Sequence, residues 1–270
     1  MPFIIAGLVI LAVFALYLLS LRGRAGHPGM EKLRGWYYAH RGLHGDGVPE
    51  NSMAAFRLAL ENGYGIELDI HLMRDGKLAV IHDSSLKRTA GAEVFVEDLS
   101  AEELPQYHLG ETEETIPLFS DVLALFGGKA PMVVELKVER NNVDALCSAA
   151  CAMLDTYDGP YCVESFDPRA ILWLKKHRPD IIRGQLAKNW LSDKIKLNPV
   201  LKWLLTCCTG NFVTRPDFIA YRFAHRKRLG TALCRKLWGV TGVSWTLRSK
   251  EDFDIAVKEG WIPIFEGFRP

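Results

Sequence analysis

The sequence has almost no net charge, because its 33 Lys and Arg are balanced by 32 Asp and Glu to leave +1 at pH 7. A chain without excess positive charge has no long-range attraction to a polyanion, so we expect no nucleic-acid partner. Its six cysteines include no Cys-x-x-Cys pair and no Cys/His spacing of a zinc site. With 270 residues, of which 49% are hydrophobic, the chain can bury a full core without disulfides, and we expect reduced thiols.

Charged residues are also absent before Arg22. Phe3 to Leu21 is therefore an uncharged run of nineteen residues. As a helix it would be about 28 Å long, which matches the ~30 Å hydrocarbon core of a bilayer. A secretory signal peptide would carry basic residues before a shorter apolar run. In this sequence the basic residues follow the run instead, at Arg22, Arg24, Lys32 and Arg34.

This pattern predicts three parts: a transmembrane anchor at residues 1–21, a linker at 22–35 and one folded domain at 36–270. By the positive-inside rule, the residues that follow the span stay in the cytoplasm, which agrees with unpaired cysteines. An uncleaved anchor in the opposite orientation is the alternative. We therefore expect a single-pass protein of the cell membrane with a cytoplasmic domain.

The run from Gly65 to Asp83, GIELDIHLMRDGKLAVIHD, predicts two antiparallel strands around an Asp75-Gly76 turn. Side chains two residues apart in a strand share a face, so Glu67 and Asp69 point the same way. If the turn has two residues, counting along both arms places His82 opposite Asp69. A bulge would shift this pairing by one residue.

Carboxylates and a histidine on one strand face need ion pairing or a cation, because burial removes their hydration. A hairpin at a sheet edge, with its polar face in water, is the alternative. Three further motifs favour the cation: Ala39-His40-Arg41-Gly42, Pro49-Glu50-Asn51-Ser52, and Met132 to Lys137 (MVVELK). On the last of these strands Glu135 and Lys137 share one face.

In order and spacing, the motifs HRG, PENS, ELDI, the DG turn, IHD and ELK resemble the glycerophosphodiester phosphodiesterase family. The resemblance covers about Trp36 to Pro270. It implies an α/β fold, a TIM-type (β/α)8 barrel, with phosphoric diester hydrolase activity and one divalent cation. It also implies roles for seven residues: His40 and His82 as the acid/base pair, Glu67, Asp69 and Glu135 as metal ligands, and Arg41 and Lys137 as phosphate contacts. The chain departs from the family pattern at Glu266-Gly267-Phe268-Arg269-Pro270, which replaces an expected T-D-R-P-like turn.

Strand and helix patterns alternate through the rest of the chain, which predicts a parallel sheet. The strand count fits a slightly irregular closed barrel if both hairpin arms join it; an open doubly wound sheet is the alternative. In either fold, ligands bind at the carboxyl ends of the strands. Trp245 lies near such an end, where it either forms an apolar wall for a glycerol moiety or serves as a packing residue. The other expected strands are 36–40, 132–137, 161–166, 181–186, 218–223, 243–247 and 262–265.

The longest interruption between strands, Ala187 to Asn211, mixes tryptophans and aliphatic residues with four lysines. This mixture is typical of a helix in a membrane interface, although core packing with lysine amines reaching water gives the same pattern. Because the segment follows a strand, we expect it on the active-site face, as a lid.

A cation held only by carboxylates is expected to be Mg²⁺ or Ca²⁺ rather than zinc. The resemblance implies attack on phosphorus by the glycerol hydroxyl of the substrate, after which water opens a cyclic phosphate to glycerol 3-phosphate and an alcohol. One alternative is a lipid-directed phosphodiesterase for lysophospholipid or phosphatidylglycerol, or a lyase that stops at the cyclic product. A non-catalytic membrane-tethered binding module is disfavoured, since idle buried charges are costly. The expected partners are the glycerophosphodiester or lysolipid substrate and membrane lipids.

Overall fold

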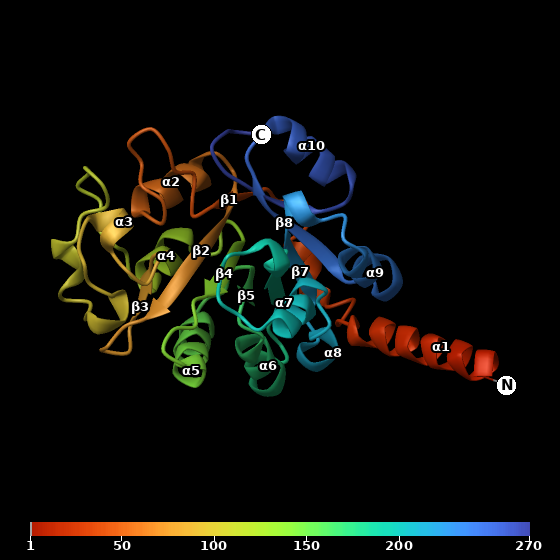
Figure 1. Cartoon of the computed structure of the whole chain (residues 1–270). Helices are drawn as coiled ribbons and strands as arrows, with labels where there is room; N and C mark the ends of the chain where they lie inside the picture. The colour runs from red at the N-terminus through yellow and green to blue at the C-terminus, as the bar shows by residue number, and fades with distance from the viewer. Residues whose placement is uncertain (1) are drawn as a thin grey trace.

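Eight parallel strands close into a barrel in the computed structural model, which describes residues 2–270 (Figure 1). The strands follow one another around the ring in chain order, and β1 closes the ring by pairing with both β2 and β9. The predicted closed barrel is therefore confirmed. Its strands are β1 (Tyr38–His40), β2 (Gly65–Leu72), β4 (Met132–Leu136), β5 (Tyr161–Ser165), β6 (Arg183–Ala187), β7 (Phe218–Arg222), β8 (Thr241–Leu247) and β9 (Ile262–Phe265).

The second arm of the predicted hairpin, β3 (Leu78–Val80), does not join the barrel but pairs antiparallel with β2 alone. The connecting loop has three residues, and Gly76 closes it at φ 81°, a backbone conformation that favours glycine. The register expected from a two-residue turn was therefore wrong by one residue. The amide of Ile81, rather than that of His82, donates to the carbonyl of Asp69 at 3.1 Å.

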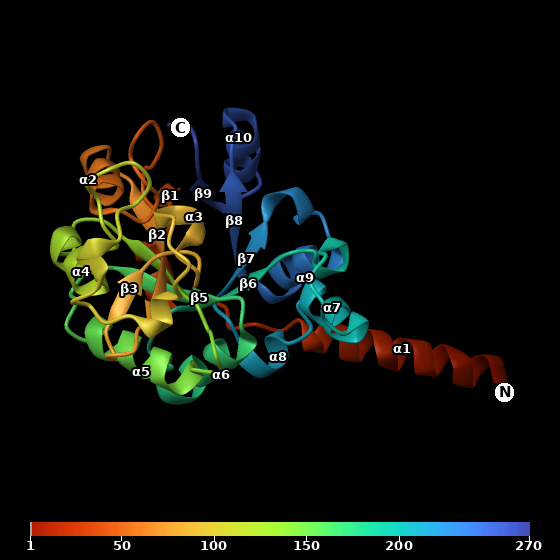
Figure 2. The same cartoon turned by 60° about the vertical axis from the view of Figure 1, so that its left-hand side comes forward.

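Helices cover the outside of the barrel (Figures 1 and 2). The first of them begins at Met53, because the Ser52 hydroxyl accepts a hydrogen bond from the amide of Ala55 at 3.1 Å and so caps the helix. The helices are α2 (Met53–Glu61), α3 (Lys87–Ala90), α4 (Phe119–Phe126), α5 (Val143–Leu154), α6 (Pro168–His177), α7 (Pro199–Thr206), α8 (Asn211–Thr214), α9 (Leu229–Trp238) and α10 (Lys250–Lys258).

Two apolar layers hold the barrel together, because successive strand residues point alternately inward and outward. The outward side chains pack against the helices in the larger core, which includes Phe56, Leu68 and Val134. The inward side chains fill the lower part of the barrel, with Tyr38 and Phe218 among the largest. At the carboxyl ends of the strands the inward positions become charged, and these positions form the site described below.

Between β3 and α4 the chain makes a long excursion with its own small core, which includes Ile81, Leu86 and Val96. Within it the buried Glu97 accepts hydrogen bonds from the Ser84 hydroxyl and the His71 ring, at 2.6 and 2.7 Å. These bonds tie the excursion to β2. The excursion therefore supports the turn that carries His82.

The helix α1 (Pro2–Ser20) projects away from the barrel beside α8 and α9, and none of its residues is buried (Figure 1). Its last turn is bonded to the domain, where the Trp238 indole donates to the Leu18 carbonyl at 2.8 Å. A helix of this length and apolarity can span a membrane, although a signal sequence passes the same test.

The segment 22–35, predicted to be a linker, packs against the barrel. Arg24 forms an ion pair with the buried Asp217, with Nη2 and Oδ2 2.6 Å apart. Met30 and Leu33 reach the apolar cluster inside the barrel. These contacts hold the carboxyl-terminal end of α1 in a defined position relative to the strands. The domain boundaries at residues 21 and 35 stay predictions.

The insert between β6 and β7 contains a short turn of helix at Trp190–Ser192, followed by α7 and α8. Most of the apolar side chains of α7 are exposed, including Val200 and Trp203. The insert contributes Lys188 to the pocket described below, but no residue of α7 lines that pocket. In this structure, α7 does not form a lid over the pocket.

Candidate active site

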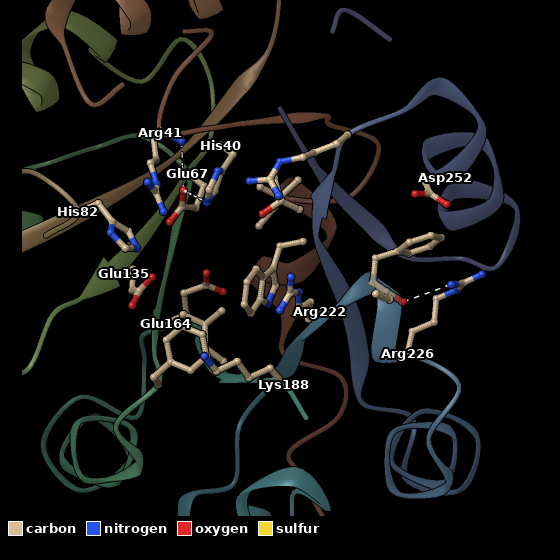
Figure 3. A pocket seen from close by; sticks show the side chains of 18 residues that line it. His40, Arg41, Glu67, His82, Glu135, Glu164, Lys188, Arg222, Arg226 and Asp252 are labelled. Atoms are coloured by element: carbon tan, nitrogen blue, oxygen red, sulfur yellow. Dashed lines mark hydrogen bonds and ion pairs between the residues drawn. The ribbon is translucent and has the colours of Figure 1, made fainter. Parts of the chain in front are cut away.

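A polar pocket of about 550 Å³ opens at the carboxyl ends of the strands (Figure 3). All eight strands of the ring contribute side chains to it, since alternate residues near each strand end point to the barrel axis. Histidine, carboxylate and guanidinium groups therefore meet in one cavity. Its charged lining residues are His40, Arg41, Glu67, His82, Glu135, Glu164, Lys188, Arg222, Arg226, Arg248 and Asp252.

Three carboxylates meet at the base of the pocket. Glu67 and Asp69 share the inner face of β2, and the parallel register sets Asp69 beside Glu135 of β4. One carboxylate oxygen from each lies within 4.8 Å of the others, and all three residues are buried. Such a cluster of oxygen donors fits a divalent cation that prefers oxygen ligands, such as Mg²⁺ or Ca²⁺. The three residues proposed as metal ligands are thus brought together.

Burial and mutual repulsion disfavour three negative charges in this place. Burial and then Asp69 and Glu135 raise the pKa of Glu67 well above its usual range. Burial also raises the pKa of Glu135, to about 7, although Lys137 opposes this. At Asp69 the effect of burial is outweighed by Lys137, His82 and Arg41, which hold its pKa far below the usual value. A bound cation would relieve the repulsion, which supports the fit.

Lys137 is the cation that the chain itself supplies to this cluster. Its ammonium lies 2.8 Å from Asp69 Oδ1 and 2.8 Å from Glu135 Oε1. Despite its burial, these two carboxylates raise its pKa above the usual value, so it stays charged. Lys137 can therefore hold an anionic group next to the carboxylates.

Arg41 is held over the same cluster by a strained loop. Its Nη1 donates to Glu50 at 2.9 Å, its Nε lies 3.6 Å from Asp69, and its backbone amide donates to Glu67 at 3.2 Å. Asn51 donates to Asp69 at 2.9 Å. Arg41 and Asn51 adopt φ of 55° and 53°, which is uncommon outside glycine and marks strain at a functional loop. The Glu50 carboxylate thus orients Arg41.

Each histidine donates a hydrogen bond from Nδ1 to a carboxylate, which leaves Nε2 for the substrate. His40 Nδ1 lies 2.6 Å from Glu266, and its Nε2 lies 3.8 Å from Glu67. His82 Nδ1 lies 2.6 Å from Asp83, which also pairs with Arg88. Burial lowers the pKa of both histidines. Burial therefore favours the neutral imidazole at both positions, whereas the Glu266 carboxylate opposes this effect at His40 and favours its protonated form.

Several lining residues were missed from the sequence, although strand alternation could have indicated them. Glu164 follows Cys162 on the inner face of β5, and Arg222 follows Ala220 on that of β7. Neither residue belongs to a motif, so alternation along the strand is the one signal that could have indicated them. Glu266, Lys188 and Arg248 lie on loops, where no periodicity predicts direction.

Trp245 lines the pocket and also packs against a neighbouring side chain of the pocket wall. Its ring meets Phe166 edge to face with centroids 5.5 Å apart, and its indole nitrogen donates to the Ala220 carbonyl at 3.0 Å. The two roles considered for Trp245 are therefore compatible. These two contacts hold the ring in a fixed orientation at the pocket.

Comparison with known proteins agrees with this geometry. Residues 40–265 match the model of the glycerophosphoryl diester phosphodiesterase family. The chain belongs to this family. It is a phosphodiesterase, as the resemblance implied, and the match extends from His40 to the end of β9.

Three relatives illustrate the range of this phosphodiesterase family. The chain is 43% identical to a glycerophosphodiester phosphodiesterase of Caldanaerobacter subterraneus over 238 residues, covering 82% of this chain and 89% of the relative. It is 36% identical to lysophospholipase D GDPD1 of Rattus norvegicus over 118 residues, covering 39% of this chain and 37% of the relative. A match at 40% identity to the Bacillus altitudinis glycerophosphodiester phosphodiesterase spans 45% of that protein.

Solved structures show the same fold. A phosphodiesterase of Oleispira antarctica, in complex with the product sn-glycerol-3-phosphate, has a TM-score of 0.71 at 21% identity. It covers 86% of this phosphodiesterase and 92% of its own chain. A glycerophosphodiester phosphodiesterase of Thermotoga maritima has a TM-score of 0.66, also at 21% identity, over 85% of this chain and 93% of that one.

Proposed function

We propose that the chain is a membrane-anchored, metal-dependent phosphodiesterase that hydrolyses glycerophosphodiesters to glycerol 3-phosphate and an alcohol. The observation that carries the proposal is that two histidines, Arg41, Glu67 and Glu135 line one pocket, and that Asp69 and Lys137 complete the cluster of carboxylates at its base. Phosphodiester cleavage needs charge neutralisation at phosphorus, a base for the nucleophile and an acid for the leaving group. This set of side chains can supply all three.

Glu67, Asp69 and Glu135 are the proposed ligands of one Mg²⁺ or Ca²⁺ ion. When bound, such an ion would neutralise a non-bridging phosphate oxygen and help position the glycerol hydroxyls. Arg41 and Lys137 are the proposed contacts to the other phosphate oxygens. Trp245 is proposed to form the apolar wall beside the glycerol carbons.

His82 is the proposed base and His40 the proposed acid. His82 donates its Nδ1 proton to Asp83, so Nε2 can take the proton of the attacking glycerol hydroxyl. Lys137 and Arg41 add to burial in keeping its pKa low, although Asp69 opposes them. His40, which Glu266 can stabilise as a cation, then gives its proton to the leaving alkoxide. In the second half His40 takes a proton from water, and His82 returns one to the glycerol oxygen as the cyclic phosphate opens.

The proposed anchor is α1, with the barrel in the cytoplasm. The apolar length of the helix and the basic residues that follow it support this orientation. The five buried cysteines without disulfides are consistent with a reducing compartment.

Product analysis tests the proposed function. The purified full chain is incubated with glycerophosphocholine and with glycerophosphoglycerol, with Mg²⁺, with Ca²⁺ or with chelator. The expected result is metal-dependent release of glycerol 3-phosphate and the free alcohol, abolished in His82→Ala. Release of another phosphate product, or unchanged release in chelator, would refute the stated reaction.

A lipid-directed reaction is the second candidate. The mouth of the pocket carries Lys188, Arg222 and Arg226, which could attract an anionic lipid surface, and one relative is a lysophospholipase D. A lysophospholipid as substrate in the same assay distinguishes the lipid-directed reaction from hydrolysis of soluble glycerophosphodiesters. A higher rate on lysolipid than on either soluble diester, or accumulation of a cyclic phosphate, would favour the lipid-directed enzyme or the lyase.

A further inference from the structure

The exposed apolar side chains of the barrel domain are gathered on one side. Among residues 22–270, thirteen large hydrophobic side chains are exposed, and ten of these lie between residues 188 and 240. The insert with α7, the short helix α8 and the helix α9 carry them. Val200, Phe212 and Leu229 are more than half exposed. Single exposed apolar residues are ordinary on a protein surface, but a concentration of this kind indicates an interaction surface.

The same segment carries a strong excess of positive charge. Residues 188–240 contain eleven Lys and Arg but only two Asp and no Glu, whereas the whole chain has a net charge of +1. Both acids are already paired, because Asp217 binds Arg24 and Asp193 lies 2.5 Å from Lys188. Arg226 is also paired, with Glu259 outside the segment, but the remaining basic residues leave a net positive charge. Apolar side chains among such cations are complementary to an anionic phospholipid surface.

The helix α1 leaves the domain through this surface. An apolar groove runs between α1 and the helices α7 and α9, and Phe14, Tyr17, Trp203 and Leu229 line it. Figure 2 shows α1 emerging beside α7 and α8. A bilayer entered by α1 would therefore lie against the exposed sides of α7, α8 and α9. The position of α1 identifies the occupant of the surface.

This surface also borders the mouth of the active site. Lys188 begins the insert and Arg222 ends β7, and both line the pocket. Trp190 of the insert packs edge to face on Phe166 of the pocket wall, with centroids 5.6 Å apart. A membrane held against residues 188–240 would thus lie next to one rim of the pocket.

We propose that residues 188–240, called the docking surface below, bind an anionic phospholipid bilayer and hold the pocket mouth beside the headgroups. The docking surface adds a second membrane contact to α1 and fixes the orientation of the barrel. The inference rests on the proposed anchoring by α1. A second copy of the chain is the other occupant that the surface could accept, and it is an outcome of the test.

A fluorophore sensitive to quenchers tests the contact in the full chain. The label is attached at Val200→Cys on α7, or at Val257→Cys on α10 as a matched exposed control. Five of the six native cysteines are buried, and labelling of the parent chain measures the background. The protein is reconstituted into vesicles of phosphatidylcholine with phosphatidylglycerol.

We expect lipid-borne quenchers to reduce the signal at position 200 severalfold more than at 257, and aqueous iodide to do the reverse. High salt or vesicles of phosphatidylcholine alone should weaken the lipid contact at position 200, because charge contributes to it. Equal access of iodide to both positions would overturn the proposal. If protection of the label at position 200 from iodide instead increases with the protein-to-lipid ratio, and chains cross-link to one another, the surface binds a second copy of the chain.

Activity gives an independent test with a matched control. Trp203→Ser with Leu229→Ser removes apolar contact from the docking surface, and Phe95→Ser removes a comparably exposed side chain elsewhere. We expect the double variant to lose about tenfold in kcat/KM on lysolipid in anionic vesicles, with soluble glycerophosphocholine unaffected. Phe95→Ser should change neither rate. Equal vesicle rates for wild type and double variant would overturn the docking surface, whereas absence of soluble activity in wild type would refute the proposed function alone.

Discussion

The Nδ1 atom of His40 lies 2.6 Å from Oε2 of Glu266, so the first strand of the barrel and the loop after the last strand together position one histidine. Arg248 approaches the same carboxylate at 3.2 Å. Glu266 lies in the C-terminal loop, where the sequence departs from the family pattern. In this chain the loop supplies a carboxylate to His40.

Glu266→Gln is expected to lower kcat about tenfold to a hundredfold with little change in KM. The amide can still accept or donate a hydrogen bond but cannot stabilise the imidazolium that the proposed acid requires. Steady-state kinetics on glycerophosphocholine measure the effect. Glu251→Gln on the exposed face of α10 is the control, and a purely structural role for Glu266 would instead appear as a changed KM or lost folding.

The Glu266 carboxylate should also contribute to stability in a pH-dependent way. Burial would raise its pKa, but the His40 hydrogen bond and the Arg248 charge lower it from 4.5 to about 2. Because the folded pKa is below the unfolded one, the contribution is present above pH 4.5 and is lost between pH 4.5 and 2. After allowance for solvent screening it amounts to about 1–2 kcal/mol.

Denaturant unfolding of wild type and Glu266→Gln at several pH values measures this contribution. The difference in free energy of unfolding should be constant near neutral pH and should shrink as the pH falls below 4.5. A difference that grows on acidification would contradict the sign of the shift.

The division of roles between the histidines predicts different leaving-group dependence. His40→Ala should lose far more rate on a substrate with an alkoxide leaving group than on one with an activated aryl leaving group, since an aryl oxide needs little protonation. His82→Ala should impair both substrates alike. Parallel rate measurements on the two substrates decide, and the opposite pattern would mean that the roles are exchanged.

Asp217→Ala is expected to destabilise the fold by about 2–4 kcal/mol. The change removes the buried carboxylate that pairs with Arg24. The same carboxylate accepts a hydrogen bond from the backbone amide of Arg183 at 2.9 Å. Chemical unfolding of the full chain in detergent measures the loss. Activity per folded molecule should be unchanged, because these residues lie outside the pocket. A neutral result would mean that the segment 22–35 adds nothing to the stability of the barrel.

The strand periodicity was sufficient to predict the barrel and the common face of Glu67 and Asp69, because alternation along a strand is local. The hairpin register was not predictable to one residue, because the loop length depends on the positive φ of Gly76. His82 reaches the pocket through a bend after β3, supported by the excursion that follows. Long-range packing, which no motif encodes, sets that position.

Side chains from loops far apart in the chain were beyond sequence reasoning. The pairing of His40 with Glu266 joins residues 226 apart. The ion pair of Arg24 with Asp217 joins residues 193 apart, and it turns a predicted linker into a packed segment. Both depend on the closure of the barrel, which brings the two ends of the domain together.

Calorimetric titration with Mg²⁺ and with Ca²⁺ most directly tests the central claim that Glu67, Asp69 and Glu135 form one cation site required for activity. Wild type should bind one ion per chain. Glu67→Gln, Asp69→Asn and Glu135→Gln should each weaken binding by about tenfold or more and abolish release of glycerol 3-phosphate, while circular dichroism shows a folded barrel. Unchanged metal affinity in all three variants would contradict the account.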